Sequence, residues 1–69
     1  MDFKLRKDSE YIELIGLLKA VNLASSGGEA KMLVGENKVK VNGSVEKRKR
    51  AKLRVGDTVE VLGEVFTIR

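Results

Sequence analysis

The hydrophobic pattern changes its period partway along the chain, and this change constrains the fold more than any other feature. Leu14, Leu17, Leu18 and Val21 follow the i, i+3, i+4, i+7 spacing of one apolar helical stripe. From Val39 onward, apolar and polar residues alternate instead, as they do in half-buried strands. Helical patterns followed by strand patterns predict an α+β domain.

The first helix is predicted to begin near Asp8 or Ser9, either of which can cap it. Glu10 and Glu13 would then lie in the first turn, where the positive end of the helix dipole favours carboxylates. Asn22 is predicted to end this helix in the left-handed conformation.

A second helix is predicted directly afterwards, because Ser26 and Glu29 have the spacing of a capping box. Ser26 should accept a hydrogen bond from the Glu29 amide while the Glu29 side chain reaches back. Gly35 and Asn37 can end this helix. The short link at residues 23–25 makes the pair a helix-turn-helix arrangement.

The remaining residues predict short strands joined by tight turns. Asn42-Gly43 is the preferred type I′ hairpin dipeptide between strands at residues 39–41 and 44–46. Residues 58–62 and 65–68 alternate as two further strands, with a turn at Gly63-Glu64, and Phe3 and Leu5 suggest a short edge strand. The predicted architecture is a single domain over residues 1–69, with a two-helix helix-turn-helix packed on a small, mainly antiparallel sheet.

Composition argues against several classes of function. The chain has no cysteine and no histidine, so it lacks the thiol nucleophile, the commonest general base and the commonest metal ligands. A chain of 69 residues also has little room for a deep pocket that excludes water. We therefore expect no catalytic activity, no metal and no cofactor.

Nothing in the sequence indicates a membrane location. No apolar run approaches the ~20 residues that a spanning helix needs, and residues 1–6 lack the apolar core of a secretory signal. We expect a cytoplasmic monomer.

The charges are strongly segregated along the chain. Residues 31–54 contain nine basic and two acidic residues, a net charge of +7, whereas the segments on either side are mildly acidic. This distribution indicates a surface for a polyanion, although charged side chains can also simply solvate a surface. A membrane-surface segment would carry apolar residues opposite its basic face, and the run at residues 47–50 has none, so nucleic acid is favoured over acidic lipid.

The order of these motifs resembles the S4-like RNA-binding domain. The resemblance covers roughly residues 12–62: an apolar helix, a Ser25-Ser26 turn, a capped helix with Ala30-Lys31, a Val-x-Val-Asn-Gly segment at 39–43, and the later run from Gly56 to Val59. The whole chain looks like the small stand-alone bacterial members of the family. The resemblance implies a non-catalytic domain that presents its second helix, the hairpin and the following loop to structured RNA.

Three positions depart from the family pattern and shift the expected site toward the later loop. Gly27 and Glu13 stand where the family often has basic residues, and Asn37 stands where it usually has glycine. Among the residues that match, Ser26, Lys31 and Asn42 correspond to family positions at the helix cap, the second helix and the hairpin turn. The full set of candidate RNA-binding residues is Lys19, Ser26, Lys31, Lys38, Lys40, Asn42, Lys47, Arg48, Lys49, Arg50, Lys52 and Arg54.

Aromatic residues, which usually read single-stranded bases by stacking, are nearly absent, so recognition of unpaired bases is not expected. Phe3 and Phe66 lie in strand patterns and are expected in the core, while the position of Tyr11 stays open. We expect recognition of structured RNA by shape and backbone, with ribosomal RNA on the ribosome or an assembly intermediate, or transfer RNA, as partners. The alternatives are an adaptor for an acidic protein and a DNA-binding helix-turn-helix protein.

Overall fold

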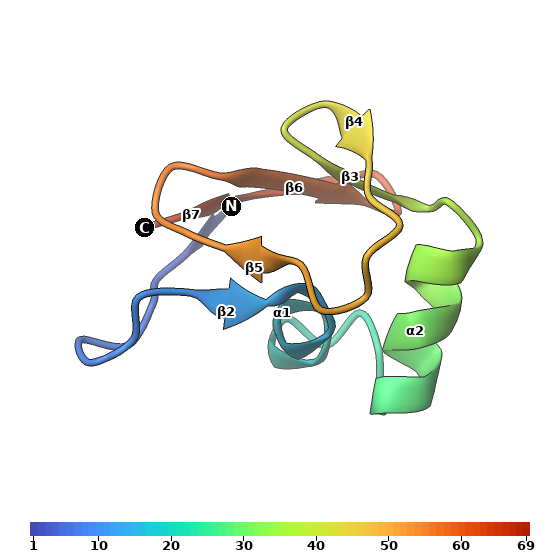
Figure 1. Cartoon of the computed structure of the whole chain (residues 1–69), viewed down its shortest axis with the longest axis horizontal. Helices are drawn as coiled ribbons and strands as arrows, with labels where there is room; N and C mark the ends of the chain where they lie inside the picture. The colour runs from blue at the N-terminus through green and yellow to red at the C-terminus, as the bar shows by residue number, and fades with distance from the viewer.

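Two short helices lie on one side of a five-stranded sheet in the computed structural model, which describes residues 1–69 (Figure 1). The α+β prediction is confirmed. The elements in chain order are β1 (Asp2–Phe3), β2 (Ile12–Glu13), α1 (Leu14–Ala20), α2 (Gly27–Gly35), β3 (Val39–Val41), β4 (Ser44–Val45), β5 (Lys52–Leu53), β6 (Thr58–Val61) and β7 (Glu64–Ile68).

The main sheet has the strand order β1-β7-β6-β3-β4. All its neighbouring strands are antiparallel except β1 and β7, which are parallel. A separate antiparallel ribbon pairs β2 with β5. The sheet is therefore mainly antiparallel, as predicted.

The first helix begins at Leu14, so the prediction of a start at Asp8 or Ser9 is wrong. Residues 12–13 form β2, because Ile12 pairs with the buried Leu53 across the ribbon. Glu13 occupies the N-cap position without a side-chain cap. The other end agrees with the prediction, since Asn22 has φ = 62° just after the helix.

The second helix has the predicted cap but a different partner for its glutamate. The Ser26 hydroxyl accepts a hydrogen bond from the Glu29 amide at 3.2 Å. The Glu29 carboxylate accepts from the Ser25 hydroxyl and does not reach back to the Ser26 amide. Asn37 has φ = 61° beyond the helix end, whereas Gly35 remains helical.

Both hairpins of the sheet turn through two residues with positive φ. Asn42 and Gly43 have φ values of 52° and 87°, which confirms the predicted turn. The second hairpin turns at Leu62-Gly63 and not at Gly63-Glu64 as predicted, because the Val61–Glu64 pairing leaves only those two residues in the loop.

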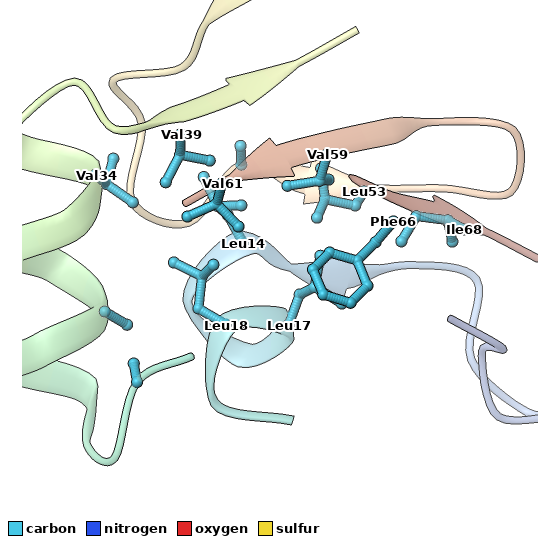
Figure 2. Close-up of a cluster of buried hydrophobic side chains, with 13 residues drawn as sticks. Leu14, Leu17, Leu18, Val34, Val39, Leu53, Val59, Val61, Phe66 and Ile68 are labelled. Carbon is cyan, nitrogen blue, oxygen red and sulfur yellow. The ribbon is translucent and has the colours of Figure 1, made fainter. Parts of the chain in front are cut away.

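The core is one cluster of thirteen buried residues, all apolar, drawn from both helices, both sheets and their connections. Figure 2 shows side chains of α1 packed beneath those of β6 and β7, with Val34 of α2 and Val39 of β3 closing one end. Phe66 is buried and Phe3 packs against the cluster, as predicted. Neither helix is long and apolar enough to cross a membrane.

Candidate nucleic-acid interface

The connection between β4 and β5 is held to the body of the protein through its backbone. The Glu46 amide donates to the Val39 carbonyl at 2.9 Å. Farther along, the Lys49 and Ala51 carbonyls accept from the Ile15 and Leu14 amides, at 3.2 and 2.9 Å. These two carbonyls satisfy the first amides of α1, which has no side-chain cap.

Four consecutive basic side chains project from this fixed backbone. Residues 47–50, here called the basic loop, are all exposed, whereas the next residue, Ala51, is buried. In Figure 1 the yellow-to-orange connection descends from β4 beside α2 before it enters β5. The loop thus presents a concentrated positive charge at a defined place on the molecule.

Within the basic loop, the Arg48 guanidinium is already paired. Its Nε and Nη2 donate to the two carboxylate oxygens of Glu46 at 3.1 and 3.3 Å, and the Arg48 amide adds a bond at 3.0 Å. The hydrogen bonds from Arg48 hold the pKa of Glu46 below its ordinary value, and the carboxylate raises the pKa of Arg48. The other three basic side chains of the loop form no ion pair.

Three lysines that were predicted to bind RNA lie on α2, on β3 and in the link between them. Lys31 is exposed on α2, and Lys40 is exposed on β3, opposite Glu60 of β6. Lys38, between these elements, pairs with Glu36 at 3.6 Å. Each could reach a polyanion, but the two acidic neighbours reduce the local positive charge.

Asn42 has a structural role that the geometry makes clear. Its side chain donates to Asp57 at 3.1 Å and accepts from the Thr58 amide at 2.9 Å, while Asp57 also accepts from the Arg54 amide at 2.8 Å. The hairpin turn and the turn at residues 54–57 are therefore linked. The Ser26 hydroxyl is likewise engaged, as the helix cap.

Lys52 and Arg54 flank Leu53 on β5 and approach an aromatic ring. The Tyr11 ring centroid lies 5.0 Å from the Lys52 Nζ and 5.6 Å from the Arg54 Cζ, both within cation–π range. The antiparallel pairing of β2 with β5 causes this proximity. No local sequence pattern reveals this proximity, because the residues are far apart in the chain.

Lys19 stands apart from the other candidates in the chain. It is exposed in the last turn of α1, where a basic residue suits the negative end of the helix dipole. The dipole accounts for this lysine without any ligand.

The exposed part of α2 is poorly suited to reading DNA bases. Lys31 is its single basic residue, beside Gly28, Glu29, Met32 and Glu36. A recognition helix normally presents several polar side chains to base edges in the major groove. This composition disfavours the DNA-binding alternative.

Comparison with known families identifies this arrangement. Residues 3–69 match the model of the S4 domain. The chain belongs to the S4 domain family. The solution structure of YbcJ from E. coli, described as revealing an ALFAL motif involved in RNA-binding, superimposes with a TM-score of 0.71 and 40% sequence identity, over 97% of this chain and 84% of that one.

Two further relatives are similar in sequence. The Escherichia coli (strain K12) protein named "Putative RNA-binding protein YbcJ" is 45% identical over 53 residues, which cover 77% of this chain and 76% of that protein. The Bacillus subtilis (strain 168) protein named "Probable ribosome maturation protein RlbA" is 43% identical over 56 residues, covering 81% and 79%. The similarity extends over most of each protein.

Proposed function

We propose that this S4 domain binds structured RNA without catalysing a reaction on it. The proposed surface consists of the basic loop, the adjoining Lys52 and Arg54, and the lysines of α2 and the β3–β4 hairpin. The names of the similar proteins refer to RNA binding and to ribosome maturation. They support RNA as the polyanion, and ribosomal RNA or an assembly intermediate as the first partners to test.

One observation carries the proposal: the backbone around the basic loop is fixed, while three of its four basic side chains are exposed and form no ion pair. Hydrogen bonds that join Glu46 to β3, and Lys49 and Ala51 to α1, hold the path of the loop before any ligand arrives. Less ordering of the backbone is then required on binding, so more of the electrostatic attraction contributes to affinity. Phosphate contacts of this kind position a protein on RNA but carry little sequence information.

Salt-dependent titration tests the proposal. A labelled RNA hairpin, a single-stranded RNA and a DNA duplex would each be titrated at several salt concentrations. We expect the hairpin to bind most tightly, with each neutralised phosphate contributing roughly −0.7 to −0.9 to the slope of log affinity against log salt. Equal, weak binding to all three would indicate a general polyanion surface and would favour the protein-adaptor alternative.

A matched pair of variants tests where the RNA binds. Lys49→Ala/Arg50→Ala removes two unpaired charges from the basic loop, and Lys7→Ala/Lys19→Ala removes two exposed, unpaired lysines outside the proposed surface. The first variant should lose affinity and reduce the slope by roughly 1.4 to 1.8, two contacts' worth. Equal losses in both variants would contradict the proposed location.

A further inference from the structure

Tyr11 is the most exposed aromatic residue of this chain. Tyr11 is 39% exposed, whereas Phe66 is buried and Phe3 packs against the core. Lys52 and Arg54 lie over its ring in cation–π contact. An accessible aromatic ring close to cations is the combination that binds unpaired nucleotides, because the ring stacks on a base while the cations attract the phosphate.

An open hollow adjoins the ring. Its volume of about 370 Å³ falls within the range of small-molecule sites. Tyr11, Leu5 and Ile12 supply apolar surface, and Lys4 and Arg6 also line it. Apolar walls with cations suit a base attached to a phosphate.

Gly16 helps to keep this hollow open. It lines the hollow from α1, and a Cβ atom at this position would lie 3.5 Å from the Ile12 Cγ1. The Ile12 side chain would tolerate that contact, so packing alone does not require glycine here. A larger side chain would instead occupy part of the space beside Tyr11.

We propose that Tyr11 and this hollow bind the base of one unpaired nucleotide that extends from the structured RNA. This inference rests on the proposed function, and it adds a subsite away from the basic loop. Asp8 and Glu10 line a second depression that also reaches Tyr11, and Glu13 pairs opposite Lys52 in the ribbon. The phosphate is therefore expected on the side of Lys4 and Arg6, away from these carboxylates, while Lys52 and Arg54 stay in cation–π contact with the ring.

The test compares two RNA hairpins that differ by one nucleotide. One is blunt-ended, and the other carries a single unpaired 3′ adenosine. Stacking on Tyr11 should make the second bind about five-fold or more tightly. Tyr11→Leu should abolish this preference, so that the two hairpins bind with equal affinity, whereas Tyr11→Phe should retain the preference.

A spectroscopic measurement gives an independent readout. Tyr11 is the only tyrosine and the chain has no tryptophan, so its ring protons can be assigned without ambiguity by NMR. Stacking should move them upfield with the 3′ adenosine hairpin and much less with the blunt one. Circular dichroism of Tyr11→Leu checks that the fold is retained.

The outcomes separate the two proposals. Tight binding of both hairpins with no preference, or a preference that survives in Tyr11→Leu, would overturn the nucleotide site and leave the proposed function standing. A gain in affinity that Gly16→Leu removes, by filling the hollow, would support the site. Failure of both hairpins to bind would overturn both proposals.

Discussion

At the scale of single residues, Glu46 holds one of the four basic side chains of the loop, that of Arg48. Its carboxylate binds the Arg48 side chain through two hydrogen bonds and the Arg48 amide through a third. Glu46 directly precedes the basic loop, and the Arg48 side chain is mostly exposed. A phosphate that binds Arg48 must therefore compete with a carboxylate that is already in place.

Glu46→Gln should increase affinity for RNA. The amide oxygen of Gln can still accept from the Arg48 backbone, so the path of the loop should persist, but the competing negative charge is gone. We expect tighter binding and a salt slope that becomes steeper by up to about 0.9, one additional phosphate contact. Weaker binding in this variant would show that the Glu46 charge organises the loop instead of opposing the ligand.

The same pair predicts a small dependence of stability on acid. The pKa of Glu46 is lowered in the folded protein by its bonds to Arg48, so the folded state favours the ionised form. The resulting stabilisation is present at neutral pH and is lost as pH falls through the lowered pKa. Urea unfolding of the wild type and Glu46→Gln should give free energies that converge in acid and differ at pH 7.

At the scale of elements, two hairpins with the same turn carry different residues at its first position. Asn42 and Leu62 both have φ = 52°, and each is followed by a glycine with φ above 80°. Asparagine visits this left-handed region readily, whereas other side chains with a Cβ pay roughly 1–2 kcal/mol. Leu62 is also largely exposed, so burial does not offset that penalty.

Leu62→Asn should therefore stabilise the protein by about 1 kcal/mol. The matched control is Asn42→Leu, which introduces the same strain in the other hairpin and also removes the bonds to Asp57 and Thr58. That variant should be destabilised by more than 1 kcal/mol. Thermal unfolding measures both, and a loss of stability in Leu62→Asn would mean that Leu62 makes a stabilising contact that outweighs the backbone strain.

The sequence predicted elements well where the signal is local. Helical spacing identified Leu14, Leu17 and Leu18 as the inward face of α1, and the Asn42-Gly43 pair predicted its turn. The prediction failed at Ile12 and Glu13, where strand formation depends on pairing with β5, about 40 residues later in the chain. The first amides of α1 are satisfied by the same distant segment, and no local capping pattern could reveal this.

The sequence also predicted only part of the candidate site: which residues are exposed, but not which side chains contact one another. Clustering of basic residues predicted that residues 47–50 would be exposed, because four consecutive charges cannot be buried. The pairing of Arg48 with Glu46 and the position of Tyr11 next to Lys52 were not predicted from the sequence. Both depend on the direction in which side chains leave a folded backbone, which charge counting does not describe.

At the scale of the whole molecule, the core and the candidate surface depend on one segment. Residues 46–53 supply the basic loop, the acceptors for the first amides of α1, and Leu53, which is buried in the core. The helices and the sheet share a single cluster of thirteen buried residues. A chain of this size has little source of stability other than this core, since it has no disulfide.

Leu53→Ala should therefore unfold the helices and the sheet together. A buried leucine truncated to alanine loses about 2–5 kcal/mol, and proteins have roughly 0.05–0.15 kcal/mol of stability per residue, so most of the margin of this chain would be lost. Val55→Ala, two residues later and largely exposed, serves as the control and should change little. Circular dichroism at 222 nm and NMR signals from the sheet should disappear in one transition for Leu53→Ala. If the helical signal persisted after the sheet signals were lost, α1 would not depend on the β4–β5 connection, and the basic loop could move without disturbing the helix.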